Sequence, residues 1–277
     1  MLKITASQVK DLRDATNVSM MECKRALQET DGDVQNAMRL LRERGIAIAA
    51  KKAGRTANNG LIASATIKNG AIASLIEVKC ETDFVARNTD FIAFVQGLAL
   101  IACNSDVSLA DQVKREVTEK IAEVGENIVV TRNTRFVIES TGRLESYIHR
   151  GKVGVLLELG YERNKTLGEV EFQTLSRDLA LHITASNPLC ISPNELPKED
   201  LISEREIYAK QVQDKPDQIA KKIIDGKIKK FYEQTCLLNQ AFVKEPKESI
   251  SDLLEKTNKV LDDTISIRRF TQYQLGE

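Results

Sequence analysis

The first 45 residues carry apolar side chains at helical spacing, divided into three short segments. Two capping boxes begin the first two segments, and they are formed by Thr5 with Gln8 and by Ser19 with Glu22. The first helix is predicted at residues 6–16, and the third is expected to stop at Gly45, because glycine commonly follows the last residue of a helix. The apolar face of the third helix is predicted to hold Val34, Ala37, Met38 and Leu41.

After residue 56 the spacing becomes that of β-strands. Two apolar runs, 61–67 and 72–78, flank Asn69-Gly70, a dipeptide that accepts the positive φ angles of a tight hairpin turn. An apolar helix is predicted next, at 91–103. The same order of features recurs 81 residues later, and the matching positions are Ile67 with Ile148, Gly70 with Gly151, Glu77 with Glu158, Phe91 with Phe172 and Leu98 with Leu179.

Two further features lie outside the repeated units. An amphipathic helix is predicted over 108–125, with Ser108 as its N-cap and Gly125 as its stop. Residues 198–235 predict an antiparallel helical hairpin that turns at Pro216. Its facing apolar positions are Leu201, Tyr208 and Val212 on one helix and Ile219, Ile223, Ile224, Ile228 and Phe231 on the other. A last helix near 250–260 and an edge strand on the second sheet end the pattern.

These patterns together predict an α+β fold with three parts. A three-helix domain and its linker are expected at 1–55. A core of two repeated hairpin-plus-helix subdomains with antiparallel sheets follows at 56–137 and 138–277, and the second subdomain contains the inserted helical hairpin 198–235.

Composition narrows the possible functions. Lys and Arg number 40, as do Asp and Glu, so no overall field attracts nucleic acid, although residues 1–55 carry eleven basic and seven acidic side chains. Five cysteines without a C-x-x-C pair, and only two histidines, favour neither disulfides nor a metal site. With no phosphate-binding glycine motif and no long apolar segment, we expect no cofactor, no membrane contact and a cytoplasmic protein.

The segment KCETDFVARN places an acid and an aromatic residue in a predicted turn. Where the first repeat has Thr82, Asp83, Phe84 and Val85, the second has Arg163, Asn164, Lys165 and Thr166. The fold therefore does not require an Asp-Phe pair at this place, which favours an exposed Phe84 that contacts a partner. Local core packing of the ring is the alternative.

Other candidate residues leave two readings open. Met20 and Met21 are adjacent on a helix, so at most one is expected in the core, and the other is either a pliable contact or without a role. His182 matches the apolar Ile101 of the first repeat, which fits either an exposed histidine or a hydrogen-bonded one. Cys80 and Asp83 lack a local nucleophile motif, and no enzymatic activity is expected.

Several segments carry a family resemblance. ITASQVKDLRDATNVSMMECKRALQ, EVKCETDFVARN, GENI, LALHITASNP and QAFVKEP occur in this order over nearly the whole chain. They resemble the bacterial elongation factor Ts family, and the three-helix segment alone is also similar to ubiquitin-associated (UBA) domains. The resemblance implies guanine-nucleotide exchange on the GTPase elongation factor Tu.

The resemblance also implies roles for single residues. Asp83 and Phe84 would enter beside the magnesium site of the GTPase, with Thr82 and Val85 shaping their turn. The other family contact positions fall on Arg13, Met20, Met21 and His182. Some members carry a further C-terminal helix, whereas this sequence ends after its last predicted strand, and in some the helical hairpin forms a homodimer. The alternative function is a UBA-type adaptor without exchange activity.

Overall fold

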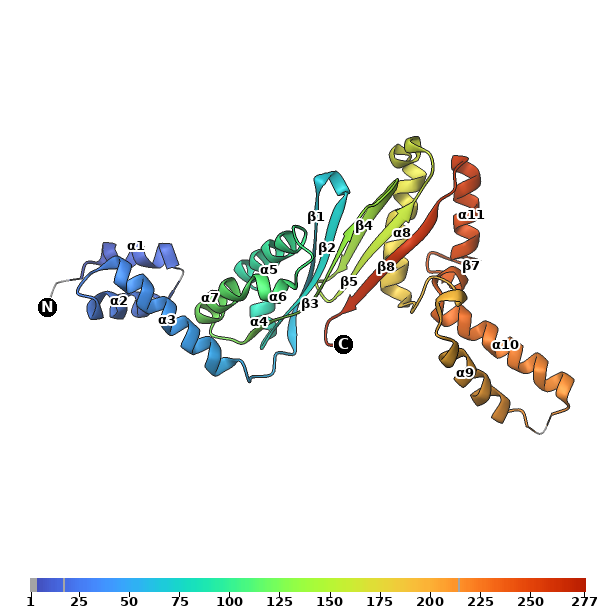
Figure 1. Cartoon of the computed structure of the whole chain (residues 1–277), viewed down its shortest axis with the longest axis horizontal. Helices are drawn as coiled ribbons and strands as arrows, with labels where there is room; N and C mark the ends of the chain where they lie inside the picture. Colours follow the sequence, from blue (N-terminus) through green and yellow to red (C-terminus); the bar gives the residue numbers. More distant parts are fainter. Residues whose placement is uncertain (1–3, 17, 214) are drawn as a thin grey trace. The chain divides into compact units, whose positions relative to one another are not determined.

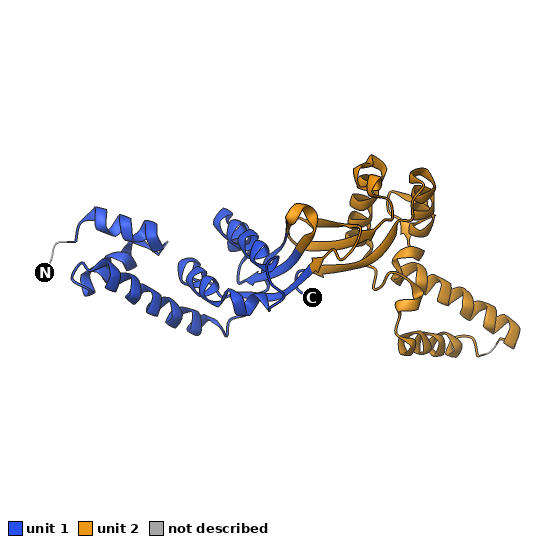
Figure 2. Ribbon diagram, turned by 45° about the horizontal axis from the view of Figure 1, so that its top comes forward, with its two compact units in different colours: residues 1–65, 74–135, 274–277 blue, residues 66–73, 136–273 orange. Residues whose placement is uncertain are grey.

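The computed structural model describes residues 4–16, 18–213 and 215–277. They form two compact units, shown in Figure 2. The first comprises residues 1–65, 74–135 and 274–277, and the second comprises residues 66–73 and 136–273. Because the first unit combines the three-helix segment with much of the first repeat, the division into three domains stays a prediction.

The chain begins with the three predicted helices, α1 (Ala6–Thr16), α2 (Met20–Glu29) and α3 (Val34–Lys52). The capping box before α1 is formed in both directions, since Thr5 N donates to Gln8 Oε1 at 3.0 Å and Gln8 N donates to Thr5 Oγ1 at 3.3 Å. The small core is made of Val9, Leu12, Cys23, Ala26, Leu27, Ala37 and Leu41. The three-helix arrangement is thus confirmed, and its likeness to a UBA domain stays a prediction.

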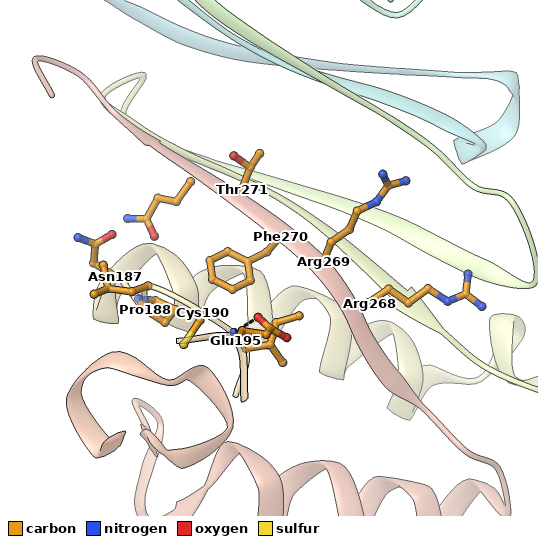
Figure 3. Close-up of a pocket in the computed structure, with 11 residues that line it drawn as sticks. Asn187, Pro188, Cys190, Glu195, Arg268, Arg269, Phe270 and Thr271 are labelled. Carbon is orange, nitrogen blue, oxygen red and sulfur yellow. Dashed lines mark hydrogen bonds between the residues drawn. The ribbon is translucent and has the colours of Figure 1, made fainter. Parts of the chain in front are cut away.

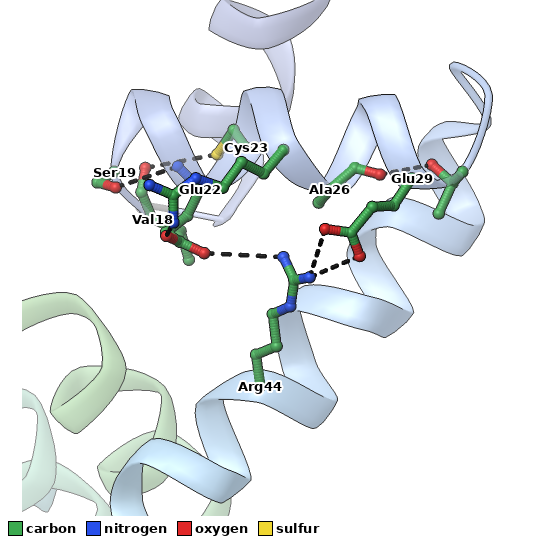
Figure 4. Close-up of polar contacts among 9 residues, drawn as sticks. Val18, Ser19, Glu22, Cys23, Ala26, Glu29 and Arg44 are labelled. Carbon is green, nitrogen blue, oxygen red and sulfur yellow. Dashed lines mark hydrogen bonds and ion pairs between the residues drawn. The ribbon is translucent and has the colours of Figure 1, made fainter.

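A carboxylate pair on α2 fastens this helix to α3 through Arg44 (Figure 4). Ser19 Oγ accepts from Glu22 N as predicted, but the Glu22 carboxylate binds Arg25 at 2.7 Å and lies 3.7 Å from Arg44. Both Glu29 oxygens accept from Arg44 Nη2, and this bond raises the pKa of Arg44 above its usual value.

Two predictions for the third helix are wrong. The helix continues through Gly45 to Lys52. Gly45 lies against Ala122, where an added Cβ would be 3.3 Å from the Ala122 Cβ. The glycine therefore permits close packing and does not end the helix. Val34 and Met38 are exposed, so the buried face of α3 consists of Ala37, Leu41 and Gly45.

The first repeat forms a hairpin and a covering helix (Figure 1). Its sheet has the order β1 (Asn59–Ile67), β2 (Ile72–Cys80) and β3 (Ile128–Val137). The turn between β1 and β2 has positive φ at Lys68, Asn69 and Gly70, one residue more than the predicted tight turn. Helix α5 (Thr89–Ala102) is bound to β2 through Ser74 Oγ, which donates to Ala99 O at 2.6 Å.

The amphipathic helix predicted over 108–125 is broken into α6 (Leu109–Gln112) and α7 (Lys114–Val124). Ser108 makes no side-chain cap bond. Asn133 of β3 takes this role, since its Oδ1 accepts from Leu109 N at 3.1 Å. Gly125 ends α7 with φ 78°, as predicted.

The second repeat has the same plan. Its sheet has the order β4 (Gly142–His149), β5 (Val153–Gly160) and β8 (Ser266–Gln274), with β4 antiparallel to β5 and β8 at the predicted edge. Helix α8 (Val170–Ser186) covers this sheet, and α11 (Ile250–Leu261) packs beside it (Figure 1). A short hairpin, β6 (Ala241–Phe242) and β7 (Glu245–Ser249), is an element that the sequence pattern did not predict.

Buried glutamates at matching positions support the third strand of each sheet. Glu77 lies in β2, and its Oε2 accepts from Arg132 Nε of β3 at 2.7 Å. Glu158 lies in β5, and its Oε2 accepts from Arg269 Nε of β8 at the same distance. The predicted repeat is confirmed in the position of both carboxylates.

The helical hairpin consists of α9 (Lys198–Lys210) and α10 (Asp217–Thr235). Ile228 of α10 and Val212, just after α9, are buried, and Lys227 Nζ lies 5.4 Å from the centre of the Tyr208 ring. Ile219 is 50% exposed, so the apolar stripe is shorter than predicted.

Candidate partner-binding site

The segment after β2 forms a single helical turn, α4 (Asp83–Ala86). Cys80 at the end of the strand and Ala86 at the end of the turn are both buried, which anchors the turn at its two ends. Thr82 is the N-cap, and its Oγ1 accepts from Val85 N at 3.3 Å. Asn88 then caps α5 by accepting from Asp90 N and Phe91 N.

The Phe84 side chain points away from this anchored turn and is 83% exposed. A phenyl ring in water forgoes about 2–3 kcal/mol of the free energy that burial would supply. Local core packing, the alternative left open by the sequence, is therefore wrong. An exposed aromatic residue on a fixed turn is suited to insertion into another molecule.

Asp83 lies beside this ring and carries a half-exposed carboxylate. Its Oδ2 is 3.0 Å from Arg87 Nη2 of the same turn. Both side chains of this ion pair face solvent, so the pair contributes little to stability and is readily exchanged for another partner.

Hydrogen bonds from a loop that is distant in sequence hold the start of the turn. Glu126 Oε2 accepts from Thr82 N at 3.0 Å, and Glu126 Oε1 accepts from Thr82 Oγ1 at 2.6 Å. In the opposite direction, Asn127 N donates to Glu81 Oε1 at 2.7 Å, and this bond lowers the pKa of the Glu81 carboxyl. We call the set Glu81, Thr82, Glu126 and Asn127 the clasp.

The other candidate positions in the first unit lie on the three-helix segment. Arg13 is exposed in the last turn of α1. Met20 and Met21, the first residues of α2, are 41% and 59% exposed. Neither methionine is a core residue, and both offer flexible apolar surface.

His182 belongs to the second unit, and of its two open readings the exposed one is wrong. Its side chain is fully buried in α8, where Nε2 lies 3.0 Å from Gln240 Oε1 and Nδ1 accepts from Val243 N at 3.3 Å. The hydrogen-bonded alternative is confirmed. Burial lowers the pKa of His182, and a ring nitrogen that accepts from Val243 N also favours the neutral form.

A separate open pocket of about 430 Å³ lies in the second unit, between the middle of β8 and the segment after α8 (Figure 3). Phe270 and Cys190 face it, and Arg268 and Arg269 line it. Both arginines form ion pairs with Glu158 of β5, so their charges are used within the sheet. Glu195 also lines the pocket, and its Oε2 accepts from Ile191 N at 2.9 Å, so the charged side chains that line it all have partners within the chain.

All five cysteines lie among the described residues, are buried and form no disulfide, and Cys80 Sγ donates to Thr82 O at 3.2 Å, which removes it as an accessible nucleophile. Among the described residues, no three His, Cys, Asp or Glu side chains gather as a metal site requires. None of the helices in this part of the chain is long and apolar enough to cross a membrane.

The residues that sequence reasoning missed are the members of the clasp other than Thr82, which are Glu81, Glu126 and Asn127. Glu126 lies within the GENI segment, 44 positions after Thr82, and only the fold brings the two together. Its one sequence signal is an acidic residue directly after the helix-ending Gly125 and shortly before a strand.

An exposed aromatic residue on a fixed turn, together with an exposed pair of methionines, is a surface suited to binding another protein. Residues 81–277 match the family described as Elongation factor TS. The whole chain is 40% identical to Elongation factor Ts of Chloroherpeton thalassium, and each chain is covered in full. Over 99% of its length it is 41% identical to Elongation factor Ts of Clostridium perfringens strain SM101, covering 93% of that protein.

The chain belongs to the elongation factor Ts family. Membership implies the role of a nucleotide-exchange factor for elongation factor Tu in translation elongation. Such a factor changes the affinity of its partner for a nucleotide and carries out no chemical reaction of its own.

Proposed function

We propose that this chain releases GDP from elongation factor Tu by placing Asp83 and Phe84 beside the magnesium site of the GTPase. The observation that carries the proposal is the Phe84 ring, which is 83% exposed on a turn fixed at both ends. The Asp83 carboxylate beside it adds negative charge, and repulsion of phosphate and competition for the metal both disfavour bound nucleotide.

The energetics of this mechanism are those of linked binding. If the factor stabilises a nucleotide-free GTPase, bound GDP must weaken binding of the factor by the same ratio. A thousandfold ratio corresponds to about 4 kcal/mol. Burial of the Phe84 ring supplies about 2–3 kcal/mol, and the lost magnesium coordination in the GTPase supplies the rest.

The three-helix segment is proposed to bind the same GTPase through Arg13, Met20 and Met21, whose side chains are all exposed. For His182 the proposal changes, because a fully buried ring cannot touch a partner. His182 instead holds the 240–243 segment against α8, through Gln240 and Val243, and any contact with the GTPase is made by that segment.

A homodimer through the helical hairpin is a further part of the proposal. Ile202 and Ile207 of α9 and Ile219 of α10 are exposed, which is more apolar surface than a solvated hairpin needs. Analytical ultracentrifugation of the full chain and of an Ile202→Lys, Ile219→Lys variant tests this point, because a monomer at high concentration in both would refute it.

The exchange function is tested by mixing the chain with elongation factor Tu that holds fluorescent GDP and timing the loss of fluorescence. We expect release to become faster in proportion to the added chain, until it saturates. A UBA-type adaptor would explain only α1, α2 and α3, and it would leave the rate of release unchanged. Because cytoplasmic translation supplies the GTPase, the chain is proposed to act in the cytoplasm.

A further inference from the structure

We propose that Glu126 is a positioning residue, which holds the Thr82 turn in the orientation that Phe84 needs in order to enter its partner. This inference rests on the proposed function of that turn. It concerns a residue that binds Thr82 through both of its carboxylate oxygens and is argued to act through Thr82.

The first step of the argument is how the Thr82 hydroxyl is used. It donates to Glu126 Oε1 at 2.6 Å and accepts from Val85 N at 3.3 Å. The same carboxylate takes the Thr82 backbone N–H on its other oxygen. Glu126 therefore fixes both the backbone and the rotamer of the residue that caps α4, and hydrogen bonds to a charged acceptor are stronger than neutral ones.

The second step is that, apart from the buried Cys80 and Ala86 at its ends and the bond from Cys80 Sγ to Thr82 O, the turn has little else to hold it. A helix of four residues is far below the length at which a helix is stable by itself. The exposed ion pair between Asp83 and Arg87 adds little, and the Phe84 ring makes few contacts with its own chain. Without Glu126, the turn would sample several orientations, and a partner would have to select one of them.

The third step links the turn to the three-helix segment. Asn127 Nδ2 donates to Arg55 O at 2.7 Å, and Arg55 Nη1 lies 3.5 Å from Glu81 Oε2. Lys52 Nζ, in the last turn of α3, donates to the carbonyl oxygen of Gly125. The clasp thus fastens the linker after α3 and the Phe84 turn to the same short loop.

The second repeat offers a matched control. There the turn η2 (Asn164–Gly168) follows β5, and the Asp263 carboxylate accepts from Arg163 N at 3.1 Å, from Glu162 N at 3.0 Å and from Thr166 Oγ1. Arg163 N is the repeat counterpart of Thr82 N. Asp263→Asn therefore weakens an equivalent brace on a turn that carries no Asp-Phe pair.

The test compares full-length variants in the GDP-release assay. Glu126→Gln removes the charge from the two bonds to Thr82, and Thr82→Val removes the hydroxyl that bonds to both Glu126 and Val85 N. Each variant is therefore expected to lower the maximal stimulated rate about tenfold. The double variant should be much faster than the product of the two single losses predicts, because both variants disrupt the bond between Thr82 Oγ1 and Glu126. Thr82→Ser keeps the hydroxyl and should retain the rate, and Asp263→Asn should stay within about twofold of the unchanged protein.

A second readout needs no GTPase. In the free protein, amide hydrogen exchange at Thr82 and Val85 should be faster in Glu126→Gln, with an unchanged thermal midpoint of unfolding. Unchanged exchange at these two amides would overturn the inference. So would a normal GDP-release rate in Glu126→Gln and Thr82→Val alongside a slow one in Phe84→Ala. If Phe84→Ala itself released GDP at the normal rate, the proposed function would be at fault instead.

Discussion

Replacing Phe84 with alanine should slow GDP release without affecting the fold. The ring is 83% exposed and packs against little of its own chain, so the free energy of unfolding should change by less than about 0.5 kcal/mol. Full burial of the ring in a partner is worth about 2–3 kcal/mol. The ratio of maximal release rate to half-saturating concentration should therefore fall about 30- to 150-fold.

The assay is stopped-flow fluorescence of GDP release from elongation factor Tu over a range of variant concentrations. Lys165→Ala is the matched control, because Lys165 is exposed at the counterpart position of the second repeat. It should leave both parameters unchanged. A Phe84→Ala variant that releases GDP as fast as the unchanged protein would refute the reasoning. An equal fall in the release rate with Lys165→Ala would show that the effect is not specific to position 84.

Three further predictions concern buried groups. Glu77→Ala removes a carboxylate that is 1% exposed and bound to Arg132, so urea denaturation should show a loss of about 2–3 kcal/mol. Burial lowers the pKa of His182, so as the pH falls the unfolded chain takes up a proton on this residue before the folded chain does. The free energy of unfolding should therefore fall as the pH drops below about 6.5, and His182→Gln should remove this contribution to the pH dependence. Burial and the neighbouring Cys236 raise the pKa of Cys190 to about 12, so mass spectrometry should show that a thiol reagent modifies it at pH 8 at least a hundredfold more slowly than in the unfolded chain. Rapid labelling of native Cys190, or a Glu77→Ala or His182→Gln profile identical to that of the unchanged protein, would contradict the respective prediction.

The parts of the fold that depend on local pattern were predictable. The capping box at Thr5 begins α1 as expected, and the 81-residue repeat placed Glu77 and Glu158 at equivalent buried positions. The repeat also made the exposure of Phe84 predictable, because its counterpart Lys165 is polar. Comparing the two repeats of the same chain gave information about exposure that the sequence of one turn alone does not contain.

What could not be predicted depends on contacts between distant segments. Gly45 looks like a helix stop until Ala122 is seen beside it. The burial of His182 depends on a hydrogen bond to Gln240, which lies 58 positions away. The two-residue strand β6 is too short to show any periodicity, and Glu126 becomes part of the site only when its loop meets Thr82.

The central claim is that the side chain at position 84 moves from water into the GTPase when nucleotide leaves. Because the chain contains no tryptophan, Phe84→Trp grown with 5-fluorotryptophan carries a single ¹⁹F label. Its resonance should differ between H₂O and D₂O in the free protein, lose that difference on binding nucleotide-free elongation factor Tu, and regain it when excess GDP and Mg²⁺ are added. A label that stays equally sensitive to solvent in all three states would contradict the account.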